Sequence, residues 1–134
     1  MILFLYSCSS NKREKFSYKN TDKEFWINSY KTEVFLSCLN EGINNDSIIK
    51  ILSRKDLLNM NENIFKDEID SARFIGKNIA KNIPKPFIKI DTDEYNLLEK
   101  KFISYNCLKY YASTELDSIA KKAYEKHLKF NNGQ

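Results

Sequence analysis

The sequence predicts an all-α domain, a compact bundle of about five helices. Three observations indicate this class. Only 3 Gly and 2 Pro occur in 134 residues, of which 42% are hydrophobic. No segment alternates apolar β-branched and polar residues, as a half-buried strand does. Several segments instead repeat apolar residues every three or four positions, which is the period of an amphipathic helix. A chain of this length suits one domain with a single core.

The first long helix is expected from Thr21 or Asp22 to Glu41. The Thr21 hydroxyl can accept from a free backbone N–H group, and Glu24, three positions on, completes a capping box. Residues spaced three and four apart form the expected inner face, with Trp26 on the other flank. This face consists of Ile27, Tyr30, Val34 and Cys38, bordered by Phe35 and Gly42.

Two further helices are expected before residue 84. A short one starts at Asp46 or Ser47 and breaks near Ser53, and a longer one starts near Glu62. The single apolar face of the longer helix consists of Phe65, Ile69, Ala72, Gly76, Ile79 and Ile83. Its small central residues, at positions 72 and 76, would let another helix approach closely. Prolines at positions 84 and 86 then end it.

The stretch Lys85–Asp93 is the least helical part of the domain, and we expect a protruding loop there. Aromatic residues are frequent anchors of protein interfaces, and Phe87 lies in this loop away from any apolar face. The candidate partner-binding residues are therefore Phe87, Lys89, Asp91 and Asp93. An acidic residue or Thr92 at positions 91–93 is expected to cap the next helix, which would run through Leu97, Leu98 and Phe102.

The segment 102–124 predicts two helices that meet at a sharp corner. Residues 102–111 are apolar around most of the helix, which is typical of a helix in the middle of a bundle. Ser113 or Thr114 can then cap the last helix, whose first turn carries Glu115 and Asp117 at the positive end of the helix dipole. The expected inner face of that helix consists of Leu116, Ile119, Ala120, Ala123, Tyr124 and Leu128.

The N-terminal residues indicate export. Residues 1–10 are a largely apolar run that is too short to span a bilayer, which takes about 20 residues. Leu5–Cys8 resembles a bacterial lipobox, in which the cysteine becomes lipid-modified, so residues 1–7 are interpreted as a truncated lipoprotein signal segment. Residues 8–20 would form a polar tether from Cys8, and Ser9 favours the outer membrane. The alternative is that residues 1–10 are a fragment of a buried helix.

If Cys8 is lipidated, Cys38 and Cys107 remain, both on apolar helix faces. An exported chain can oxidise such a pair, so we expect an interhelical disulfide. Cross-linking residues this far apart stabilises a fold by about 4 kcal/mol in the chain-entropy model. The alternative is that both are ordinary buried thiols.

Composition argues against several functions. The net charge of +4 comes from 22 basic and 18 acidic residues that are interleaved, so nucleic acid is not an expected partner. No His, Cys and Asp residues have metal-ligand spacing, so neither a metal nor another cofactor is expected. Nucleophilic catalysis needs a base beside the nucleophile, and His127 is the one histidine. A Cys107–His127 dyad would require a buried thiol, and we do not expect an enzyme.

The C-terminal third also carries a family resemblance. The order of residues is Cys107, Leu108, Tyr110, Tyr111, Ser113, Glu115, Leu116 and Asp117, followed by Lys121 or Lys122. This order resembles the C-terminal signature of the type VI secretion amidase immunity proteins over about twenty residues. The chain departs from the pattern at Asn106, where a basic residue is usual, and at Tyr110, where an aliphatic residue is more common. The motif residues expected to have structural roles are Cys107, Tyr111, Ser113, Glu115, Leu116 and Asp117.

The resemblance implies that residues 21–134 form an immunity-protein-like domain in the periplasm. Such a protein binds a peptidoglycan amidase effector and occludes its Cys–His cleft, with a loop and a helix face as the plug. It also implies a homodimer. The expected contact with a membrane is only through the lipid anchor at Cys8. Two alternatives remain: a small helical envelope lipoprotein that serves as a scaffold or assembly component, and a cytosolic helical regulator with reduced thiols.

Overall fold

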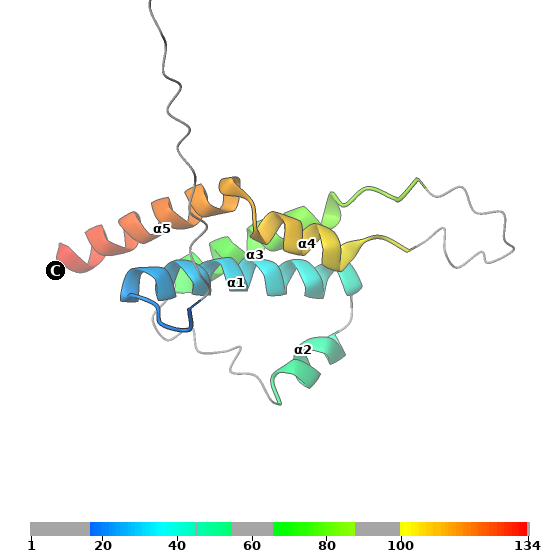
Figure 1. Ribbon diagram of the computed structural model, residues 1–134, viewed down its shortest axis with the longest axis horizontal. Helices are drawn as coiled ribbons and strands as arrows, with labels where there is room; N and C mark the ends of the chain where they lie inside the picture. The colour runs from blue at the N-terminus through cyan, green and yellow to red at the C-terminus, as the bar shows by residue number, and fades with distance from the viewer. Residues whose placement is uncertain (1–16, 45, 55–65, 88–99, 134) are drawn as a thin grey trace, which may run out of the picture.

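The computed structural model describes residues 17–44, 46–54, 66–87 and 100–133. Over these ranges it contains helices and no strand (Figure 1). The helices are α1 (Asp22–Ile43), α2 (Asp46–Leu52), α3 (Lys66–Lys81), α4 (Ile103–Tyr111) and α5 (Thr114–Asn132). The predicted all-α class with about five helices is confirmed.

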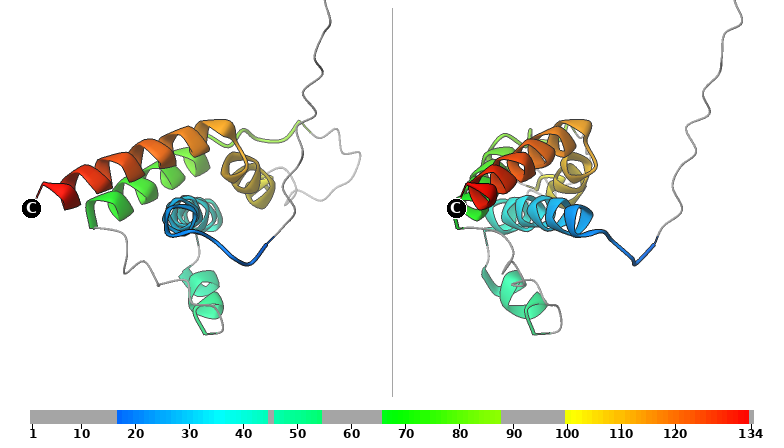
Figure 2. Two further views of the ribbon diagram at one scale, coloured as in Figure 1. Left: turned by 60° about the vertical axis from the view of Figure 1, so that its left-hand side comes forward. Right: turned by 90° about the vertical axis from the view of Figure 1, so that its left-hand side faces the viewer.

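Helix α1 is the centre of the arrangement, because it contacts each of the other four helices. Helices α3, α4 and α5 pack against it, and α2 lies on the side of α1 opposite to α5 (Figure 2). The start of α1 and the end of α5 lie at the same end of the molecule (Figure 1). The chain therefore enters and leaves the bundle at one end.

The predicted capping box starts α1. The Thr21 hydroxyl oxygen accepts from the backbone N–H of Glu24 at 3.2 Å, and the Glu24 carboxylate accepts from the backbone N–H of Thr21 at 2.7 Å. The Thr21 hydroxyl also donates to the Glu24 carboxylate at 2.9 Å, and the hydrogen bonds that this carboxylate accepts from the Thr21 backbone and hydroxyl lower the pKa of Glu24. The helix ends at Ile43, because Asn44 adopts the left-handed conformation with a φ of 51°.

Two groups of buried side chains form the core. The larger joins α1, α3 and α5 through Trp26, Tyr30, Val34, Ala72, Leu116 and Ala120. The smaller lies nearer α4 and consists of Cys38, Ala80, Ile83 and Cys107. Most residues of the predicted inner faces are buried or partly buried in these groups.

Trp26 lies at the border of the inner face of α1. The spacing placed it on the flank away from Phe35, and in the fold this flank is covered, so the Trp26 side chain is only 4% exposed. The indole stacks on Tyr30, with ring centroids 5.7 Å apart, and α5 covers it with Tyr124 and His127 at 5.4 and 5.2 Å. Because α5 packs beside α3, the buried face of α1 is wider than its apolar periodicity indicates.

The predicted close approach at Ala72 and Gly76 occurs between α3 and α1. Ala72 is fully buried. A Cβ atom at Gly76 would lie 2.8 Å from the Ser37 Cβ and 2.9 Å from the Cys38 backbone nitrogen. Glycine at position 76 therefore lets the two backbones touch. The expected helix start at Glu62 lies outside the described residues, and the helix ends at Lys81, before the two prolines.

The start and the environment of α4 both differ from expectation. Residues 100–102 are not helical, and the Phe102 ψ of 65° is outside the helical range, so no helix runs through Phe102. The helix also does not lie in the middle of the bundle. Of its nine residues, Cys107 alone is buried, because α4 packs through one side against α1 while Tyr105 and Leu108 face outward.

The inner face of α5 is shifted by one residue near its end. Leu128 was expected there but is 38% exposed, whereas His127 is only 9% exposed. The buried residues Leu116, Ala120 and His127 continue with spacings of four and seven, which keeps them on one side of the helix. The buried face of α5 therefore includes His127 and not Leu128 near the end of the helix.

Candidate functional site

The corner between α4 and α5 holds the motif residues, and each has a structural partner there. The Ser113 hydroxyl accepts from the Leu116 backbone N–H at 3.1 Å and donates to the Tyr110 carbonyl at 2.7 Å. One hydroxyl thus caps α5 and closes the end of α4. Leu116, in the first turn of α5, is fully buried in the core. The expected structural role of these two residues agrees with the geometry.

Asp117 fixes the corner to α1 through an ion pair with Lys31. The Lys31 side chain is 11% exposed and that of Asp117 is 42% exposed, so the lysine is the more deeply desolvated partner. The Lys31 ammonium also lies 4.8 Å from the centroid of the Tyr111 ring, and that ring contacts Phe35 edge-on at 5.9 Å. Two motif residues therefore stabilise one buried cation.

Glu115 accepts a hydrogen bond of 3.1 Å from the Tyr110 hydroxyl. Burial of the phenol, together with the Glu115 carboxylate beside it, raises the pKa of Tyr110 to about 12. The hydroxyl therefore stays protonated and remains a donor over the physiological range. This contact links the last turn of α4 to the first turn of α5.

The predicted disulfide is present between Cys38 and Cys107, 69 residues apart, with a Cα–Cα distance of 5.8 Å. Both residues are 1% exposed. It joins the middle of α4 to α1, so α4 has a covalent support on the side that faces the core. The Cys107 sulfur is engaged in this bond and His127 packs on Trp26, so the two do not form the dyad considered from the sequence.

On the outer side, α4 presents large apolar residues to solvent. Phe102, Tyr105 and Leu108 are 58%, 63% and 57% exposed. Tyr105 and Leu108 lie three residues apart on α4, and Phe102 directly precedes the first residue of the helix; we call these three residues the α4 apolar face. Large apolar side chains gathered on one exposed surface are typical of interaction sites. Sequence reasoning missed this surface, because the apolar residues that form it were taken as core.

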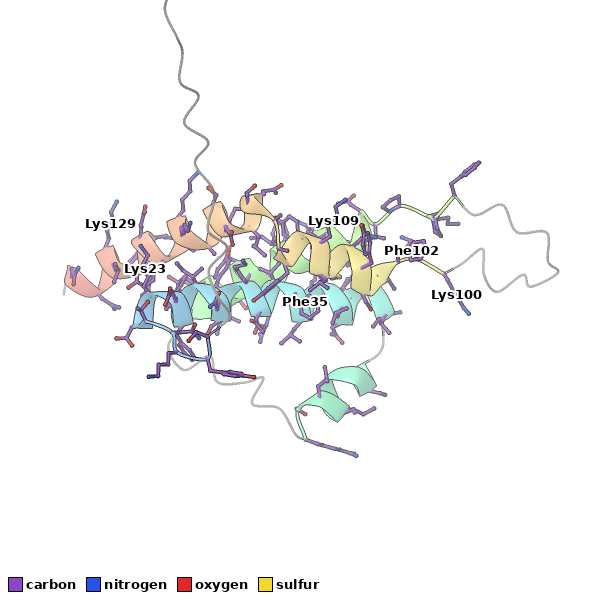
Figure 3. The ribbon with its side chains drawn as sticks, in the orientation of Figure 1. Lys23, Phe35, Lys100, Phe102, Lys109 and Lys129 are labelled. Atoms are coloured by element: carbon purple, nitrogen blue, oxygen red, sulfur yellow. A yellow bond between two sulfur atoms is a disulfide. The ribbon has the colours of Figure 1, made fainter. Side chains whose placement is uncertain are left out.

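A hollow lies beside the start of α4. Its volume is about 460 Å³, and its lining consists of Glu41, Gly42, Ala80, Lys81, Lys100, Lys101 and Ile103. The one acid, Glu41, lies 3.9 Å from Lys81, so the cations exceed the anions. Figure 3 shows Lys100 and Phe102 at the same end of the molecule. A basic hollow thus adjoins the α4 apolar face.

Of the four candidate partner-binding residues, the structure describes Phe87. Phe87 is 94% exposed and non-helical, as expected for a loop anchor. Lys89, Asp91 and Asp93, like Cys8, lie outside the described residues. Among the residues that are described, no group of His, Cys, Asp and Glu side chains could hold a metal ion. Over the same ranges, no helix has the length and apolar character needed to cross a membrane.

No known protein family, curated protein or solved structure matches this chain.

Proposed function

We propose that this chain is an immunity protein that binds a type VI secreted peptidoglycan amidase and occludes its active site. It acts in the periplasm, anchored to the outer membrane through Cys8, and protects the cell wall from the cell's own amidase or from one delivered by sibling cells. The motif from Cys107 to Asp117 supports the proposal, because its residues jointly build the corner that fixes α4. The Cys38–Cys107 disulfide supports export, since such bonds persist in oxidising compartments.

The α4 apolar face is the observation that carries the proposal. Tyr105 and Leu108 stand in solvent on a short helix that the disulfide and the corner contacts hold in place, and Phe102 is exposed at its start. A surface that is rigid before binding loses little conformational entropy when a partner docks. Occlusion of an enzyme needs this kind of surface and no reaction by the inhibitor.

The basic hollow indicates which charge a partner should carry next to the α4 apolar face. Lys100 and Lys101 line it without an acidic partner among the described residues. A partner surface that carries carboxylates around an apolar centre would therefore complement this end of the molecule. Phe87 supplies a further exposed aromatic side chain on the segment that follows α3.

The first experiment measures binding to amidases of the NlpC/P60 type, beginning with any whose gene is found next to the gene for this chain. The Tyr105→Ala and Leu108→Ala variants should each weaken binding at least about tenfold, the cost expected when an interface anchor is truncated. Phe74→Ala is the matched control, because Phe74 is 65% exposed and lies on α3. Lysis protection in cells that receive the amidase should fall in the same order.

The outcome distinguishes the proposal from a general envelope scaffold. Equal binding by the α4 variants and the Phe74 variant would refute the assignment of the surface. Absence of any complex with the neighbouring amidase would refute the immunity function itself. The resemblance also implies two copies of this chain with two amidase molecules, which light scattering of the purified complex would test.

A separate variant tests the loop. Phe87→Ala, combined with charge reversal at Asp91, should reduce lysis protection if the loop enters the amidase cleft. Full protection by this double variant would exclude the loop as the plug and leave the α4 apolar face as the binding surface.

A further inference from the structure

The outer side of α5 carries a concentrated positive charge. Lys122, Lys126 and Lys129 are spaced four and three apart, so they lie along one side of the helix. All three are exposed, and we call them the lysine stripe. Lys121 is exposed beside them, and Glu125 is the one acid between residues 118 and 133.

The lysine stripe is not neutralised within the molecule. None of its ammonium groups forms an ion pair with an acid in the part of the chain that the structure describes. Lys23, at the start of α1, lies 5.9 Å from the centroid of the Tyr124 ring and so adds a cation next to α5. Asp22 and Glu24 flank Lys23 in the first turn of α1, and the Glu24 carboxylate is engaged by the backbone and hydroxyl of Thr21.

An apolar side chain borders the stripe. Phe130 follows Lys126 by four residues and is 66% exposed. The apolar face of α5 is buried in the core, so any contact with a bilayer would be made by its exposed lysines, which an anionic lipid surface attracts, and by the adjoining Phe130 ring. Helix α5 contains no arginine, the residue that most often contacts phosphates and base edges in nucleic-acid interfaces.

We propose that the lysine stripe docks on an anionic phospholipid bilayer, with Phe130 at the level of the headgroups. The chain enters the bundle at the end where α5 finishes, so a tether from Cys8 would bring this end toward the membrane (Figure 1). The inference rests on the proposed envelope location, and it does not depend on amidase binding. It adds a second membrane contact to the lipid anchor.

Docking through α5 leaves the proposed amidase-binding surface accessible. Figure 3 shows Lys129 and Lys100 at opposite ends of the molecule. The α4 apolar face adjoins Lys100, so a bilayer against the end of α5 would not cover it. Together the tether and the stripe would orient the bundle with α4 directed away from the lipid.

The test measures sedimentation of the full chain with vesicles of phosphatidylcholine alone and with vesicles that also contain phosphatidylglycerol. Binding to the neutral vesicles measures the contribution of the apolar N-terminal residues, and the additional binding to the anionic vesicles measures the contribution of charge. The variant Lys122→Gln/Lys126→Gln/Lys129→Gln is compared with Lys50→Gln/Lys77→Gln/Lys85→Gln, whose lysines are exposed on other segments. Both variants lose the same charge, so they separate a local site from a bulk effect.

The stripe variant should lose about fivefold in affinity per lysine for the anionic vesicles, or about a hundredfold in total, while the control variant stays near wild type. Raising the ionic strength from about 0.1 M to about 1 M should abolish the anionic preference, because the screening length falls from about 10 Å to about 3 Å. Equal losses in the two variants, or no preference for anionic vesicles, would overturn the proposal. So would binding of a DNA duplex that depends on the stripe when anionic vesicles are not preferred.

Discussion

Loss of the Cys38–Cys107 disulfide is expected to be the largest single perturbation of this fold. The bond joins residues 69 positions apart and lies in the core beside Ala80 and Ile83. Reduction leaves the sequence unchanged and alters the shape of the core little. The stability that it removes is therefore mainly the restriction that the cross-link places on the unfolded chain.

The magnitude follows from the length of the closed loop. For 69 residues the chain-entropy relation gives a loss of about 15 cal/mol/K in the unfolded state, or about 4 kcal/mol at 25 °C. Native domains are stable by only about 5–15 kcal/mol. Reduction would therefore remove a large part of the total stability and lower the melting temperature by more than about 10 °C.

Urea unfolding of the oxidised and reduced wild-type protein measures this difference. The Cys38→Ala/Cys107→Ala variant is the control, because its unfolding curve should not respond to reductant. The variant should also resemble the reduced wild type, apart from the small cavity that each truncation leaves. A thiol-reactive probe applied without reductant should label neither cysteine in exported protein.

A difference below about 1 kcal/mol between oxidised and reduced protein would refute the loop-entropy reasoning. It would mean that residues 38 and 107 remain close in the unfolded ensemble, or that the bond strains the folded state. Labelling of either cysteine in native exported protein would contradict the cross-link itself.

Three further changes test other contacts. Gly76→Ala should destabilise the fold by about 2 kcal/mol in urea unfolding, because the new methyl group meets the α1 backbone; unchanged stability would contradict the close approach. Asp117→Asn should cost about 2 kcal/mol by leaving Lys31 desolvated and unpaired, and it should cost less in a Lys31→Met background; equal costs in a double-mutant cycle would exclude coupling. Tyr110 should ionise near pH 12, so the stability that its buried hydroxyl provides should persist below about pH 10 and be lost between pH 10 and 12. The tyrosinate absorbance titration should lose one late-ionising group in Tyr110→Phe, and a titration identical to wild type would disprove the assignment.

Features set by local sequence could be predicted before the structure. The capping box at Thr21 and Glu24 needs only residues three positions apart. The close approach at Gly76 followed from the apolar periodicity of its helix. The pairing of Cys38 with Cys107 followed from their places on apolar helix faces together with the expected export of the chain and lipidation of Cys8. These predictions did not depend on how the helices are arranged.

Features set by helix arrangement could not be predicted. Whether Trp26 is buried depends on where α5 lies, and its ring partners are about a hundred residues further along the chain. The apolar pattern of α4 does not indicate that this helix is short or that it lies at the edge of the bundle. The pattern therefore predicts Tyr105 and Leu108 as core residues, whereas the packing of α4 on α1 through one side leaves both exposed.

The central position of α1 has a consequence for incomplete chains. This helix is made early, yet Cys107, Leu116 and Ala120, which complete its covering, belong to the last third of the sequence. A product that stops before residue 103 would leave Tyr30 and Val34 without the covering of α5, and Cys38 without its bonding partner. Prematurely terminated or proteolytically shortened copies should accordingly be cleared as misfolded protein, so that a cell accumulates either the full-length protein or none.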